Sequence, residues 1–197
     1  MKTNRITRKS TEALVLGAIL TALVVILQML GTFIRFGAFQ VSLVLIPIVL
    51  GASKCGVRVG AWLGFVFGLV VLLNGDAALF LAVNVAGTII TVLLKGILCG
   101  LAAGIVYKSL EKYNGLLAVI AAAFVCPVVN TSVFLLGCFV FFMDSADAIA
   151  STIGMNVSGM ALFWALAMGN FFLEIATNVV LSPVIVRVLK IEKKNKI

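Results

Sequence analysis

Two charged residues, Lys95 and Glu174, stand inside long apolar stretches of the sequence. A charged side chain in the hydrocarbon of a membrane is costly, so each one needs a partner or a function. Asn170, Glu174 and Asn178 follow one another at intervals of four residues, so in a helix they share one face, which should point away from lipid. We predict that these three are structural polar residues, while a ligand contact by Glu174 stays equally open.

The position of Lys95 suits the capture of an anion. It lies well before the basic end of its apolar segment, about 18 Å from the inner surface if the segment is helical. A cation in the outer half of a helix bundle can receive an anionic group from outside the membrane. We therefore predict that Lys95 binds substrate, and the alternative is that Lys95 and Glu174 pair with each other and only hold the bundle together.

Further polar candidates come from a proline-containing segment and from the segment ends. Pro127 removes a helical hydrogen bond and frees a carbonyl group, and Asn130 and Thr131 follow it. A polar pocket at this point and a simple helix kink are equally open. Near the outer boundary, the remaining candidates for substrate contact are Arg35, Gln40 and Asn84. An arginine or lysine there would suit a carboxylate or phosphate.

Motifs for catalysis or metal binding are missing from the sequence. There is no histidine, and the four cysteines form no CxxC pair, which removes most metal sites and general bases. A GxxxxGK[ST] phosphate loop is also missing, as are the GxSxG and HExxH motifs. We expect no catalytic residue, metal or cofactor, so the natural interpretation is binding or transport.

The elements that position these residues are apolar segments long enough to cross a membrane. Of 197 residues, 63% are hydrophobic and 11% charged, far from the balance of soluble domains. We predict an all-α, polytopic membrane protein with one domain and six transmembrane helices. Their approximate ranges are 12–34, 36–53, 57–73, 85–107, 116–142 and 160–188. The second and third are short for a full span.

The distribution of basic residues sets the orientation. With six helices and the N-terminus in the cytoplasm, almost all lysine and arginine residues outside the helices fall on the inner side, and Arg35 alone falls outside. Asp76, Asp144 and Asp147 fall in outer loops. This bias predicts that both termini are cytoplasmic. It also argues against nucleic-acid binding, because the net charge of +8 is explained by the loops.

Small residues recur at four-residue spacing in several segments. Glycines stand at positions 56, 60, 64 and 68, and again at 96, 100 and 104. Such spacing lets neighbouring helix backbones approach closely, and ordinary helix packing explains most of these glycines. In the first segment, Ala18 and Ala22 have the same spacing and could face another protein.

These features together resemble the substrate-binding membrane subunit, or S component, of energy-coupling factor (ECF) transporters. The residues that carry the resemblance are the Ala18-Ile-Leu-Thr-Ala22 AxxxA motif, Leu45-Ile-Pro47-Ile-Val-Leu-Gly51 with the glycines after it, and Lys95-Gly96-Ile-Leu-Cys-Gly100-Leu-Ala-Ala-Gly104. The similarity covers nearly the whole chain. Two departures are Lys95, where arginine is more readily expected, and Cys55-Gly56-Val57, where a Gly-Pro pair is common.

The resemblance implies partners and a class of substrate. Such subunits capture a vitamin or related micronutrient at the outer face of a bacterial-type cell membrane. They work with a transmembrane coupling protein and two ABC-type ATPases, which hydrolyse the ATP. In this family the AxxxA face of the first helix packs against the coupling protein, so the resemblance implies that role for Ala18 and Ala22. The segment from Pro127 to Thr131 loosely resembles the sequences of family members that are specific for pantothenate. Pantothenate is therefore the first expectation for the substrate, followed by folate and riboflavin.

Three other functions stay open on the residues alone. A stand-alone secondary transporter of a small metabolite would need a protonatable residue on its path, and Glu174 is the one mid-membrane candidate. An intramembrane enzyme acting on lipid would need clustered acids or a nucleophile with a base, and the sequence offers neither. A structural subunit without a ligand would not need the polar outer face.

Overall fold

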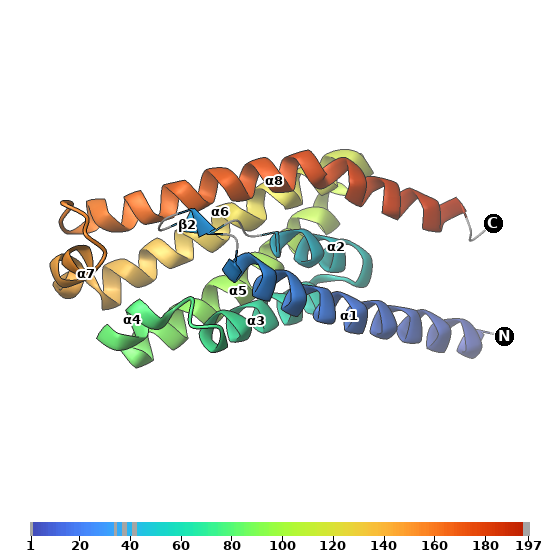
Figure 1. The fold of residues 1–197 in the computed structure, drawn as a ribbon. Coiled ribbons are helices and arrows are strands. Elements are labelled where there is room, and N and C mark those ends of the chain that lie inside the picture. The colour runs from blue at the N-terminus through green and yellow to red at the C-terminus, as the bar shows by residue number, and fades with distance from the viewer. Residues whose placement is uncertain (1, 34, 37–38, 41–42, 195–197) are drawn as a thin grey trace.

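The computed structural model describes residues 2–33, 35–36, 39–40 and 43–194, and it places side chains in 11–31, 43–180 and 183. The long helices and the shorter α2 lie roughly along one axis (Figure 1). They are α1 (Lys2–Phe33), α2 (Leu45–Cys55), α3 (Val57–Leu73), α5 (Val85–Leu110), α6 (Gly115–Phe141) and α8 (Met160–Lys194). The minor elements are strands β1 (Arg35–Phe36) and β2 (Phe39–Gln40), α4 (Ala78–Val83), the 3₁₀ turn η1 (Met143–Ser145) and α7 (Ala146–Thr152).

Four stretches of helix among the described residues are long and apolar enough to cross a membrane. They are 11–31 of α1, all of α5 and α6, and 160–180 of α8. Large apolar side chains on their outer faces are exposed, such as Leu14 and Val180, each at 72%. Exposed apolar surface of this kind is suited to lipid. The fold is therefore all-helical apart from the two-residue strands, as predicted, and apolar enough to be embedded in a membrane.

The two remaining long-axis helices are shorter. The apolar helices α2 and α3 have 11 and 17 residues, which at 1.5 Å per residue is about 16 Å and about 26 Å. A bilayer core is about 30 Å thick. Six full crossings therefore stay a prediction.

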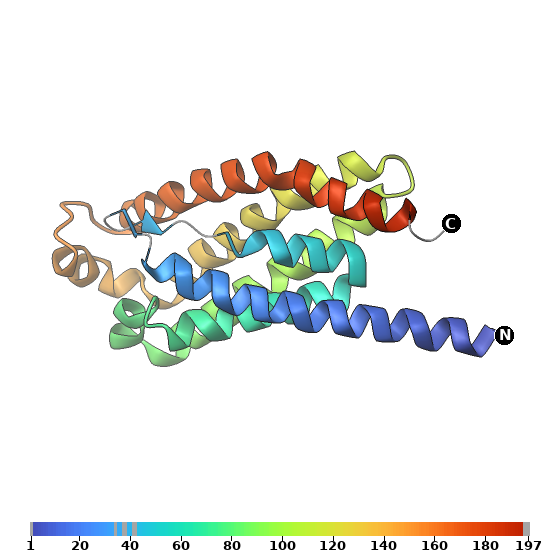
Figure 2. The same ribbon diagram turned by 45° about the vertical axis from the view of Figure 1, so that its right-hand side comes forward.

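Both ends of the chain lie at the same end of the bundle, and α4 and α7 lie at the opposite end (Figures 1 and 2). The α2–α3 and α5–α6 connections lie nearer the end that holds the termini. This arrangement is what an even number of passes produces. Which end faces the cytoplasm stays a prediction from the charge distribution.

One predicted helix boundary is wrong. The range 36–53 was expected to be a single helix, but α2 begins only at Leu45, and β1 and β2 pair as a short antiparallel ladder before it. The stretch before Leu45 contains glycine, phenylalanine, valine and serine, which all favour a helix less than alanine or leucine does. The predicted range 57–73 coincides with α3, and the other four ranges match α1, α5, α6 and α8 with shifted ends.

Helices α3 and α5 pack with their backbones in direct contact. A Cβ atom added at Gly64 would collide with the carbonyl oxygen of Gly96, and one added at Gly60 would lie 2.7 Å from the carbonyl oxygen of Gly100. A Cβ atom added at Gly68 would likewise lie 2.8 Å from the carbonyl oxygen of Val92. The four-residue glycine spacing therefore serves helix packing, as predicted, and it holds α5 rigidly against α3.

The connection 143–159 contains helix α7. Ile149 and Ala146 of α7 are buried against Leu162 and Phe163 of α8 in a second apolar cluster. This cluster packs α7 onto α8 at the end of the bundle opposite to the termini.

Candidate functional site

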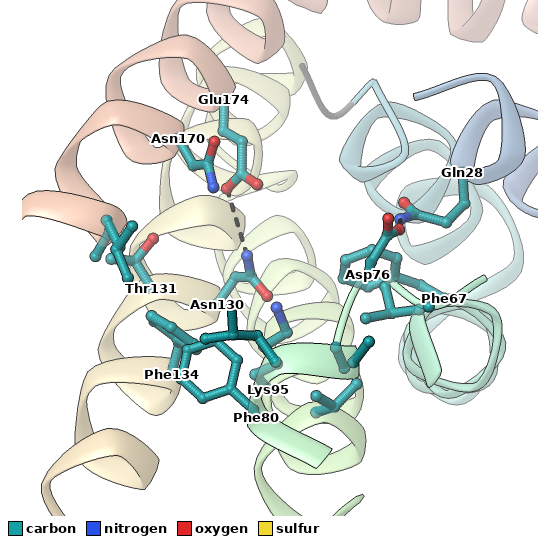
Figure 3. Close-up of a pocket in the computed structure, with 18 of the residues that line it drawn as sticks. Gln28, Phe67, Asp76, Phe80, Lys95, Asn130, Thr131, Phe134, Asn170 and Glu174 are labelled. Carbon is teal, nitrogen blue, oxygen red and sulfur yellow. Dashed lines mark hydrogen bonds between the residues drawn. The ribbon is translucent and has the colours of Figure 1, made fainter. Parts of the chain in front are cut away.

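A cavity of about 490 Å³ lies within the bundle, towards the end that carries α4 and α7. Its walls come from α1, α3, α5, α6 and α8, and the stretch 75–80 and Ile153 add to them. The polar and charged residues of the lining are Gln28, Asp76, Lys95, Asn130, Thr131, Asn170 and Glu174 (Figure 3). A mostly apolar cavity with a few convergent polar groups is the usual form of a small-molecule site.

Lys95 projects from α5 into this cavity between two aromatic rings. Its Nζ lies 5.6 Å from the ring centroid of Phe67 and 5.5 Å from that of Phe134. Both distances fall within the range in which a cation is attracted to a ring face. No ion pair joins Lys95 to a carboxylate within the described part of the chain.

Asn130 and Glu174 join α6 to α8 at the wall of the cavity. The Asn130 Nδ2 donates a hydrogen bond to Oε2 of Glu174 over 3.4 Å, and both residues are only 5% exposed. The Asn130 Oδ1 is buried and has no hydrogen-bond partner among the described residues. A buried acceptor left in this state costs free energy unless something donates to it.

A second acid lies across the cavity from Glu174 (Figure 3). The Gln28 Nε2 of α1 donates a hydrogen bond of 2.7 Å to Oδ2 of Asp76, which follows α3. This bond ties the first helix to the rim of the cavity.

Five of the residues singled out in the sequence meet in this cavity. They are Lys95, Asn130 and Thr131, predicted to bind substrate, and Asn170 and Glu174, predicted to be structural. Asn178 shares the α8 face but lies outside the cavity lining. It is 1% exposed, and neither of its amide atoms has a partner among the described residues.

Of the other three predicted ligands, Asn84 does not line the cavity. Asn84 is the N-cap of α5, and its side-chain oxygen accepts a hydrogen bond of 2.9 Å from the Gly87 amide. It is a capping residue because a free amide at a helix start needs an acceptor. The side chains of Arg35 and Gln40 lie outside the part of the chain whose side chains the structure describes, and only their backbones pair, between β1 and β2.

A family model for the substrate-specific component of ECF transporters matches residues 12–186, nearly the whole chain. The chain belongs to this family. The resemblance seen in the sequence is therefore confirmed. Comparison with curated proteins gives no match.

This membership gives the chain its general role. Substrate-specific components are membrane-embedded, substrate-binding subunits of transporters and not enzymes, and they work with an ECF transporter module. In the described cavity a cation, amides and aromatic rings converge. It is therefore the candidate substrate site of this S component.

The expected partner surface of the S component is exposed. Ala18 and Ala22 lie on the outer face of α1, beside Leu14 and Ile19, which are 72% and 59% exposed. The small side chains leave a shallow stripe on which another helix could pack closely. This placement fits the predicted role of the two alanines, which stays a prediction.

Sequence reasoning missed several residues of the cavity. Phe80 lines the cavity and packs edge-on against Phe134 with ring centroids 5.7 Å apart. Phe67, Gln28 and Asp76 were not assigned to the substrate site. Only Gln28 and Asp76 carried a usable signal, because each is a polar residue at the outer end of an apolar segment.

Proposed function

We propose that this S component captures a water-soluble vitamin that carries an anionic group, in the cavity around Lys95. The vitamin then crosses the membrane with the help of a transmembrane coupling protein and two ABC-type ATPases. The observation that carries the proposal is the ammonium group of Lys95, held between Phe67 and Phe134 and not engaged in an ion pair in the described chain. Buried cations of this kind persist when a counter-charge arrives with a ligand.

The orientation of the cavity supports uptake from outside. The cavity lies towards the end of the bundle opposite to the termini. The charge distribution predicts that the termini are cytoplasmic. In this orientation a substrate enters from the outer side to contact Lys95. Ala18 and Ala22 on α1 face the membrane, where the coupling protein can pack against them.

The size and chemistry of the cavity favour a compact substrate. A volume of about 490 Å³ is in the lower part of the range for small-molecule sites. Thr131 and the amides of Asn130 and Asn170 can bond to hydroxyl and amide groups. Pantothenate combines a carboxylate with an amide and two hydroxyls and is the first candidate, with folate and riboflavin next.

The test is uptake of radiolabelled pantothenate, folate and riboflavin into proteoliposomes. The chain is reconstituted alone or with a coupling protein and its two ATPases, with ATP on the ATPase side. We expect uptake only with the complete module and ATP. Uptake by the chain alone would favour the stand-alone secondary transporter, for which Glu174 in the cavity is the supporting observation.

A further inference from the structure

The cavity offers acceptors as well as a cation. Glu174 accepts one hydrogen bond on Oε2, from Asn130, and the described residues donate none to its Oε1. The Oδ1 of the same asparagine is a second buried acceptor without a donor among the described residues. These two oxygens belong to side chains that lie next to each other at the wall of the cavity (Figure 3).

The charges explain why an acid alone would be a poor occupant. Lys95 and Glu174 both line the cavity, and no ion pair joins them in the described chain. A ligand whose only polar group is an anion would bind the Lys95 ammonium, which is the positive charge opposite Glu174. The ligand would also bring a second negative charge close to the Glu174 carboxylate. A buried carboxylate without a compensating positive charge is strongly unfavourable.

A hydrogen-bond donor on the ligand removes this difficulty. A hydroxyl or amine that reaches Glu174 Oε1 gives this acceptor a donor, while the anionic group of the same ligand stays on Lys95. Hydrogen bonds to a charged group contribute more than those between neutral groups. The polar groups of the cavity are therefore complementary to a molecule with two unlike ends.

We infer that the substrate of this S component is bifunctional: an acid that also carries a hydroxyl or amine donor, with Lys95 holding the acid and Glu174, positioned by Asn130, holding the donor. This inference rests on the proposed function and narrows its substrate class. Glu174 then determines specificity and is more than the structural residue that the sequence predicted.

The inference is tested by binding of matched probes to the purified full chain in nanodiscs. Pantothenate is compared with its analogue that lacks both hydroxyls and with pantothenol, in which an alcohol replaces the carboxylate. Folate, with amino donors, and lipoate and nicotinate, acids without a hydroxyl or amine, complete the series. The variants are Glu174→Gln and Lys95→Met, with Leu173→Met and Leu94→Met as controls at neighbouring, exposed positions.

We expect acids with a donor to bind and the acids without one to bind at least about tenfold more weakly. A hydroxyl donor would let Glu174→Gln keep most of its affinity, since an amide oxygen still accepts, whereas an amine donor would make that variant lose far more. In either case the difference in affinity between acids with and without a donor should shrink in Glu174→Gln, because the neutral amide no longer disfavours the acid that lacks a donor. The controls should match the wild type.

Three results would overturn the inference. Equal binding of pantothenate and its analogue without hydroxyls, or tight binding of lipoate or nicotinate, would do so while leaving the proposed function in place. An affinity gap that is unchanged in Glu174→Gln would remove Glu174 from the site. No binding and no uptake for any vitamin of the series would instead bring down the proposed function itself, and the inference with it.

Discussion

Asn130 donates a hydrogen bond from Nδ2 to Oε2 of Glu174 across 44 residues of sequence and between two helices, with both side chains almost fully buried. The bond fixes α8 against α6 at the wall of the substrate cavity. It also partly compensates a carboxylate that would otherwise be buried without a partner. The pair is thus both a structural link and a part of the candidate site.

Replacement of Asn130 by alanine should lower the free energy of unfolding by about 1.5–3 kcal/mol, because it leaves the Glu174 carboxylate without its donor. Thermal unfolding in detergent measures the change. Ser132→Ala, at an exposed position two residues along the same helix, is the control and should change little. Equal stability of both variants would mean that the bond contributes nothing.

An alanine at Gly64 should destabilise the bundle by about 1–3 kcal/mol, since its Cβ would meet the Gly96 carbonyl oxygen and force α3 away from α5. Gly115→Ala is the matched control, because a Cβ at Gly115 meets nothing within 4 Å. The two variants are compared by thermal unfolding. A Gly64→Ala protein as stable as the control would contradict the observed backbone contact.

Asn84→Ala should cost about 1 kcal/mol of stability and leave substrate affinity unchanged, because Asn84 caps α5 and does not line the cavity. Asn84→Ser, which keeps an acceptor for the Gly87 amide, should restore most of the stability. Unfolding and ligand binding are measured on the same preparations. A selective loss of affinity in both variants would return Asn84 to the substrate site.

Tryptophan at Ala18 or Ala22 should weaken assembly with the coupling protein and spare ligand binding, because both residues lie on the exposed face of α1, away from the cavity. Co-purification with the ECF module and binding to the isolated subunit separate the two effects. Leu136→Trp, at a position 63% exposed on α6, controls for the bulk of the new side chain. Normal co-purification of the α1 variants would show that the face with Ala18 and Ala22 does not bind the coupling protein.

The helices that build the site could be predicted from apolar length, charge and glycine spacing. The range 57–73 coincides with α3, and Lys95 and Glu174 were found because a charge in an apolar segment is conspicuous. These signals are local in the sequence, since length and polarity are read within one segment at a time.

The composition of the cavity could not be predicted in full. Phe67 and Phe134 are ordinary apolar residues in their own helices, and only the packing of α3 and α6 around α5 brings them to Lys95. Likewise, the bond from Gln28 to Asp76 joins positions 48 residues apart. Contacts between helices of this kind leave no periodic trace in a single sequence.

The central claim, that the cavity around Lys95 binds an anionic vitamin, is tested most directly by a thermal-shift screen of the purified protein and its Lys95→Met variant against water-soluble vitamins. A ligand at about 100 times its dissociation constant should raise apparent stability by about 2.7 kcal/mol. We predict one clear anionic hit for the wild type and an affinity for it that is lower by more than about 1 kcal/mol in Lys95→Met. An equal shift in both proteins, or no hit at all, would contradict the account.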